Sequence, residues 1–197
     1  MSIALKLSME QTSSGFVAEL LQGCIRGDRL CQKKLYELHH GKMMAICLRY
    51  SEDYEEARDI LTEGFMKVFL NLTKYQPHHP LETWMKRIMI NTAIDHYRKN
   101  KKTQYHIPIE NAYNESIPDD FSGLDQLSVD EILKMVQKLS PAYRTVFNLY
   151  IVEGYNHREI GEMLNISEGT SKSNLAKAKA RLQVLIAEKI PHPQYIQ

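Results

Sequence analysis

The sequence contains few of the residues that build cross-linked or metal-bound scaffolds. Its 197 residues include three cysteines with no CxxC spacing, which excludes a disulfide scaffold and a zinc finger. Nine glycines and seven prolines are too few for a low-complexity or collagen-like chain. Transmembrane-length apolar runs are absent, and the N-terminus lacks the apolar stretch of a secretory signal. We therefore expect a soluble, helical, cytoplasmic protein that does not insert into a membrane.

Sequence motifs of catalysis and cofactor binding are also missing. The chain has no HExxH, no Walker motif and no GxGxxG. Its eight histidines include pairs at 39–40 and 78–79, which we interpret as surface residues rather than metal ligands. The sequence thus predicts no catalytic residue, no metal and no cofactor, and a protein that is not an enzyme. The enzyme alternative is a helical hydrolase that holds a metal on the histidine pairs, and metal analysis of the purified protein would test it.

Charge is nearly balanced over the whole chain but unevenly distributed along it. The formal net charge is +1, yet residues 103–133 carry seven acids and no lysine or arginine. Four basic residues crowd into 98–102, and five lie within 172–189 against one glutamate. Two basic elements separated by an acidic connector are typical of a chain that meets a polyanion at two places. The alternative is that each basic run is simply a solvated helix face.

Apolar residues recur at helical spacing over most of the chain. One stripe runs through residues 57–72 and a second through 84–93, whereas prolines, asparagines and serines interrupt any period from 103 to 128. Helical spacing returns beyond that point. The pattern predicts an all-α protein with two helical domains, residues 14–102 and 129–190, joined by a flexible acidic linker at 103–128.

The C-terminal domain contains the pattern of a helix-turn-helix. Asn156 followed by Glu159 resembles a capping box, Asn165 suits a left-handed turn residue, and Ser167 can cap a longer second helix. Gly161 is the small residue that close approach of the two helices needs. Such a pair places its second helix in the major groove of DNA. The alternative is an ordinary two-helix hairpin with a basic surface.

Two stretches resemble regions of the bacterial sigma-70 family. From Leu139 the chain reads LSPAYRTVFNLYIVEGYNHREIGEMLNISEGTSKSNLAKAKARL, which is similar to the fourth conserved region of these sigma factors. Upstream, EEARDILTEGFMKVFLNLTKY followed by LETWMKRIMINTAIDHYRKNKK is similar to the second region. Members with only these two regions form the extracytoplasmic-function (ECF) class. The resemblance implies a non-enzymatic protein that binds core RNA polymerase, through the β′ coiled coil and the β flap, and promoter DNA, with an anti-sigma factor as a further partner.

The resemblance also assigns roles to individual residues. The helix that docks on the β′ coiled coil corresponds here to a surface made of Asp59, Thr62, Glu63 and Lys67. The −10 promoter element is engaged by Gln76, His78 and His79 from a loop, and by Arg87, Asn91, Arg98 and Lys99 from the following helix. The −35 element is read by Arg158, Glu168, Thr170, Lys172, Ser173, Asn174 and Lys177.

Three positions depart from the family pattern, and one rival function remains. Thr62 replaces a common glutamine, Asn174 replaces a frequent arginine, and Ser171 stands where a buried valine is usual. We expect the Ser171 hydroxyl to be half-buried and to bond a carbonyl one turn back. The rival is a helix-turn-helix repressor or activator that binds its operator as a dimer.

Overall fold

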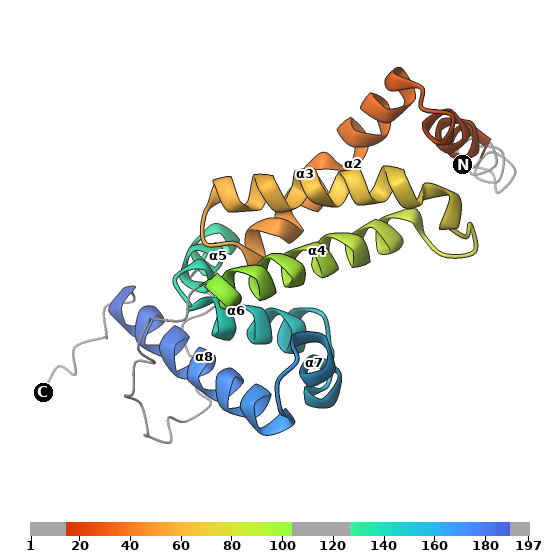
Figure 1. Ribbon diagram of the computed structural model, residues 1–197. Coiled ribbons are helices and arrows are strands. Elements are labelled where there is room, and N and C mark those ends of the chain that lie inside the picture. Colours follow the sequence, from red (N-terminus) through yellow and green to blue (C-terminus); the bar gives the residue numbers. More distant parts are fainter. Residues whose placement is uncertain (1–14, 104–126, 190–197) are drawn as a thin grey trace, which may run out of the picture.

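The computed structural model describes residues 15–103 and 127–189, and every element in these ranges is helical (Figure 1). A first helix over residues 15–25 precedes α2 (Arg29–Tyr50), α3 (Tyr54–Asn71), the short 3₁₀ helix η1 (Leu72–Lys74) and α4 (Leu81–Thr103). The C-terminal unit consists of α5 (Val129–Gln137), α6 (Pro141–Phe147), the π-helical turn η3 (Asn148–Val152), α7 (His157–Leu164) and α8 (Glu168–Lys189). The all-α prediction is confirmed. Most of the expected linker, residues 104–126, lies outside the described residues.

The N-terminal unit is a bundle in which α2, α3 and α4 pack against one another (Figure 1). Asp28 and Asp53 cap α2 and α3 by accepting hydrogen bonds from backbone amides of the first turns. The predicted apolar stripe of α3 is the core-facing one, because Ala57, Ile60 and Leu61 are almost completely buried. Helix α4 begins at Leu81, three residues before the start that its apolar stripe suggests.

The C-terminal unit is a helix-turn-helix supported by two short helices. Ser128 and Asn156 each form a capping box with the glutamate three residues later. Asn165 has a φ of 52°, the left-handed conformation that the sequence predicts between α7 and α8. Ser167 accepts a hydrogen bond from the Thr170 amide and so caps α8. The predicted helix-turn-helix is confirmed in its local geometry.

The two units share one apolar core. The larger cluster of buried side chains contains residues of α2, α3 and α4 together with Val146, Leu149, Ile160, Leu164 and Leu175 of the C-terminal unit. Polar contacts join the same elements: the Asn148 amide donates to the Arg49 carbonyl at 2.6 Å, and the Gln137 amide donates to the Leu48 carbonyl at 3.2 Å. The units are therefore packed together in a closed arrangement.

Gly161 allows α7 to approach the turn that leads into α8. A Cβ atom at this position would lie 2.8 Å from the backbone carbonyl oxygen of Ile166, which a side-chain rotation cannot relieve. We expect Gly161→Ala to destabilise the protein by about 1–3 kcal/mol in urea unfolding followed by circular dichroism. Gly41→Ala is the matched control, because nothing lies within 4 Å of its Cβ and alanine favours the interior of α2. Equal stability of the two variants would contradict this packing role.

Candidate functional site

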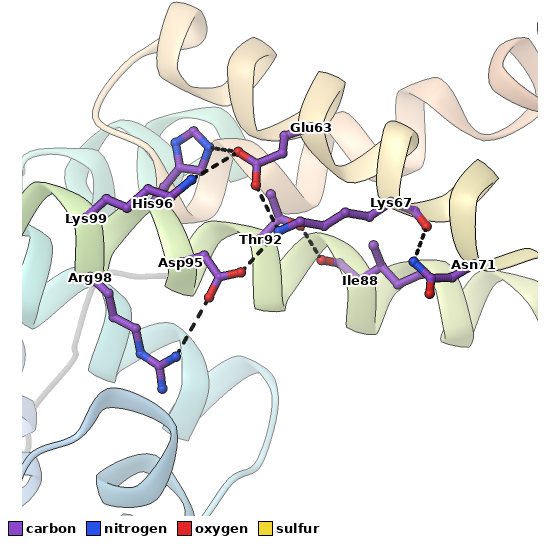
Figure 2. A network of polar contacts seen from close by, with 9 residues as sticks. All are labelled: Glu63, Lys67, Asn71, Ile88, Thr92, Asp95, His96, Arg98 and Lys99. Atoms are coloured by element: carbon purple, nitrogen blue, oxygen red, sulfur yellow. Dashed lines mark hydrogen bonds and ion pairs between the residues drawn. The ribbon is translucent and has the colours of Figure 1, made fainter. Parts of the chain in front are cut away.

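Glu63 and Lys67 of α3 point toward α4 and form a polar network with it (Figure 2). The Lys67 ammonium lies 2.9 Å from one Glu63 oxygen and 3.1 Å from Asp95. The other Glu63 oxygen lies 2.8 Å from Nε2 of His96, and Lys99 approaches it at 3.8 Å. The hydrogen bond from Lys67, followed by that from His96, lowers the pKa of Glu63 to about 2. These five side chains tie α3 to α4.

The solvent-facing stripe of α3 differs from the polymerase-docking surface that the resemblance assigns to this helix. Asp59 and Thr62 are exposed, but they share their stripe with Met66 and Leu70, which are 59% and 77% exposed. Positions 59, 62, 66 and 70 follow one another at three- and four-residue steps. Sequence reasoning missed the two apolar residues, although their spacing from Asp59 and their position off the core-facing stripe would have identified them. An exposed apolar pair beside polar groups is typical of a protein-binding surface.

The network around Glu63 makes a pH-dependent contribution to stability. A carboxylate whose pKa is depressed stabilises the fold above its ordinary pKa near 4.5, and this contribution is lost as the pH falls toward about 2. We expect Glu63→Gln to lower the free energy of unfolding at pH 7 by on the order of 1 kcal/mol. The difference from the unsubstituted protein should shrink steadily below pH 4.5. Urea unfolding from pH 7 to pH 3.5 measures it, and a difference independent of pH would contradict the network's role.

Helix α4 carries several of the predicted DNA-binding residues on the side that faces the C-terminal unit. Arg98 donates a hydrogen bond to the Met163 carbonyl of α7, and Asn91, Ile94 and Arg98 line a shallow pocket closed by Met163. At 100° per residue, Arg87 falls on the same side of the helix. Lys99 does not belong to this group, because it approaches Glu63 on α3 instead (Figure 2).

The loop before α4 is exposed at the predicted base-contacting positions. Gln76, His78 and His79 are all exposed, and the two imidazole rings lie 4.1 Å apart. The Tyr75 hydroxyl donates to the His79 carbonyl at 2.7 Å, which fixes the course of the backbone. Trp84 lies at the start of α4 with its ring 5.5 Å from that of Tyr75 and packs against the core.

Most of the predicted −35 residues lie at the free N-terminal part of α8 and on α7. Arg158, Glu168, Thr170, Lys172 and Ser173 are exposed, whereas Asn174 and Lys177 are half-buried. Lys172 pairs with Glu168 at 2.7 Å along the helix. Gly169, Ser173 and Ala176 are exposed and lie opposite the buried side of α8. The N-terminal part of α8 lies on the side of the C-terminal unit that is away from α4 (Figure 1).

Ser171 differs from expectation both in burial and in partner. Its side chain is completely buried, and its hydroxyl lies 3.0 Å from Nδ1 of His157 in α7 rather than bonding a carbonyl one turn back. The His157 ring stacks on Tyr150 with 4.5 Å between ring centroids. His157 of α7 therefore provides a hydrogen-bond partner for the hydroxyl that replaces the usual valine. The contact links α7 to α8 and holds these two helices in register.

The histidine pairs do not assemble a metal site among residues 15–103 and 127–189. His39 lies 3.8 Å from Glu82, and its pKa is lowered, chiefly by burial. His78 and His79 lie on the exposed loop before α4. In this described part of the chain no three histidine, cysteine or acidic side chains come close enough to hold a metal ion. The described helices also include none long and apolar enough to cross a membrane.

Sequence comparisons match both units to one family. Residues 35–103 match the model of Sigma-70 region 2, and residues 129–182 match that of Sigma-70, region 4. Together the two matches span more than half of the chain, with region 2 before region 4. The chain belongs to the sigma-70 family.

Two ECF sigma factors match this sigma factor along nearly their whole length. It is 29% identical over 169 residues to the ECF RNA polymerase sigma factor SigW of Bacillus subtilis, covering 80% of this chain and 90% of SigW. SigM of the same organism is 28% identical over 155 residues, covering 77% and 93%. The protein is a sigma factor of the ECF class that binds core RNA polymerase and directs promoter-specific initiation of transcription. Sigma factors as a family are not enzymes.

Solved structures with a similar fold include a sigma factor bound to an anti-sigma factor. The sigma factor RpoE in complex with the anti-sigma factor NepR from Bartonella quintana matches with a TM-score of 0.47 and 20% identity, over 80% of this chain and 98% of RpoE. CnrH in complex with the cytosolic domain of CnrY matches with a TM-score of 0.44 and 18% identity, over 87% and 97%.

Proposed function

We propose that this sigma factor binds promoter DNA and core polymerase through separate surfaces. Helix α4 and the loop before it engage the −10 element, and α8 reads the −35 element. Helix α3 binds the β′ coiled coil, and the C-terminal unit contacts the β flap. The observation that carries the proposal is that one chain holds a helix-turn-helix and a second, polar and basic helix face on separate units. A DNA-binding protein with only one of these two surfaces would not need polymerase to place it on DNA.

The −10 contact rests on the side of α4 that holds Arg87, Asn91 and Arg98. A guanidinium and an amide are suited to phosphates and to the edges of unstacked bases. The exposed Gln76, His78 and His79 lie in the loop that leads to the same helix and add hydrogen-bonding groups. Lys99 lies at the edge of this surface, where its side chain is 69% exposed, and adds a further cation.

The −35 contact rests on the N-terminal half of α8. Small side chains at Gly169, Ser173 and Ala176 let the helix axis lie close to the floor of the major groove. Thr170 and Lys172 flank this strip and reach bases or phosphates, and Arg158 on α7 reaches the backbone. Asn174 and Lys177 lie at the edge of the strip and contribute less.

We further propose that the protein acts in the cytoplasm, where polymerase and promoter DNA occur, and that it catalyses no reaction itself. An anti-sigma factor is the partner that membership of the ECF class implies. Affinity capture of the full-length protein from cells before and after stress tests this partner, and capture that yields polymerase subunits alone in both states would contradict it.

Permanganate footprinting of a cognate promoter tests the function. We expect unpaired thymines near −10 only when this protein and core polymerase are both present. We also expect the free protein to bind DNA weakly and with strong salt dependence. Protein alone and core alone are the controls. Tight, sequence-specific binding by the free protein, with no opening when core is added, would contradict the proposal and favour a repressor.

A further inference from the structure

The carboxylate of Glu153 lies between the two units and is held by two cations. Glu153 follows η3, and only 4% of its side chain is exposed. One oxygen accepts a hydrogen bond from Nη2 of Arg49 at 3.2 Å, and the other lies 2.5 Å from Nζ of Lys86. Arg49 belongs to α2 and Lys86 to α4, so both cations come from the N-terminal unit and the anion comes from the C-terminal unit.

The two cations form a site that Glu153 fills incompletely. In the part of the chain that the structure describes, Glu153 is the ion-pair partner of each cation. The buried Nε of Arg49 has no hydrogen-bond partner among the same residues, so this guanidinium uses one edge donor where two are available. A phosphodiester is not tethered to the end of η3, so its two non-bridging oxygens can engage both Nε and Nη2 as well as the ammonium of Lys86.

The contact cannot persist when both promoter elements are bound. Elements centred near −10 and −35 are separated by roughly 25 base pairs, or about 85 Å of duplex. In the closed arrangement, by contrast, Arg98 of α4 is hydrogen-bonded to the Met163 carbonyl of α7. The units must therefore separate on the promoter, and separation removes Glu153 from Arg49 and Lys86.

Lys86 is positioned to meet the same DNA strand as the proposed DNA-binding residues of α4. With 100° between successive residues, Lys86, Arg87, Asn91 and Arg98 fall within about 140° of the helix circumference. Lys86 lies about 18 Å along the axis from Arg98, a distance that several nucleotides span. Resting on the function proposed for α4, we infer that Arg49 and Lys86 bind a backbone phosphate of promoter DNA, and that Glu153 occupies this site while the units are closed.

This assignment requires substitutions on the two sides of one ion pair to have opposite effects. Lys86→Gln and Arg49→Gln remove phosphate ligands, so each should weaken promoter binding by the holoenzyme about fivefold and lower its salt slope by about one. Glu153→Gln removes the competing anion, so it should strengthen binding about threefold and leave the slope unchanged. Lys86→Arg should retain binding. Combining Glu153→Gln with Lys86→Gln should give binding between those of the two single variants, because Arg49 remains and no longer pairs with Glu153.

Holoenzyme assembled with each full-length variant is titrated with a fluorescent promoter between 50 and 300 mM salt, together with permanganate footprinting. Lys33→Gln on α2 and Glu188→Gln on α8 are exposed controls that change charge by the same amount. Stronger binding by all three interface variants would mean that the ion pair only holds the units closed, and would overturn the phosphate site. Unchanged binding in all three would overturn it too. In both cases the unsubstituted holoenzyme still opens the promoter, whereas failure of that opening would instead overturn the proposed function.

Discussion

Replacing Asp59 and Met66 with arginine is expected to abolish promoter opening, because both lie on the α3 stripe that we propose binds polymerase. Two bulky cations would remove an exposed apolar contact and reverse a charge at the centre of that surface. Central interface residues commonly cost 2 kcal/mol or more when replaced, about 30-fold in affinity each. We therefore expect core binding to fall by a factor on the order of 1,000.

Glu63 is a poorer choice for this test, although the family resemblance assigns it to the docking surface. Its carboxylate is bonded to Lys67 and His96, so an arginine there would disrupt the contact between α3 and α4 before it affected any partner. Glu37→Arg with Leu38→Arg is the matched control, since it makes the same two kinds of change on exposed residues of α2. Capture of core polymerase and permanganate reactivity are measured together. Normal capture by the Asp59 and Met66 variant would show that polymerase binds elsewhere.

Lys172→Ala is expected to weaken recognition of the −35 element more than any other single lysine or arginine substitution on α8. Lys172 is exposed in the second turn of the helix, and its contact with Glu168 holds the ammonium near the N-terminal end. The ammonium in turn lowers the pKa of Glu168, which keeps that carboxylate charged. We expect about a tenfold loss of holoenzyme affinity for a promoter with an intact −35 element.

Arg181→Ala is the comparison for this experiment, because Arg181 is exposed more than two turns farther along α8. A phosphate contact at that distance would affect all sequences alike and change the salt slope by about one. Affinities for promoters with intact and scrambled −35 elements separate the two behaviours. If Arg181→Ala abolished discrimination while Lys172→Ala left it intact, the proposed orientation of α8 in the groove would be wrong.

The parts of the fold that follow from short-range chemistry could be predicted from the sequence. Asn156 with Glu159, Asn165 and Ser167 each act on backbone groups a few residues away, so their roles in the helix-turn-helix do not depend on the rest of the protein. The buried stripe of α3 follows in the same way from helical period. The π-helical turn after α6 has no comparable pattern, and the sequence predicts an ordinary helix there.

Side-chain partners across the molecule were decided only by the tertiary structure. Helical period places Glu63, Lys67, Met66 and Leu70 off the core-facing stripe of α3. It cannot tell that the first two meet α4 whereas the other two remain exposed. Ser171 finds His157 on another helix because α7 packs at that register, although a carbonyl in its own helix is nearer in sequence. Arg49 and Glu153 are 104 residues apart, and their contact exists because the two units bury a common apolar core. The sequence by itself therefore determined the helices, the caps and the family, since these depend on neighbours within a few residues. Which charges are paired, and which helix faces are covered, depended on how distant helices pack.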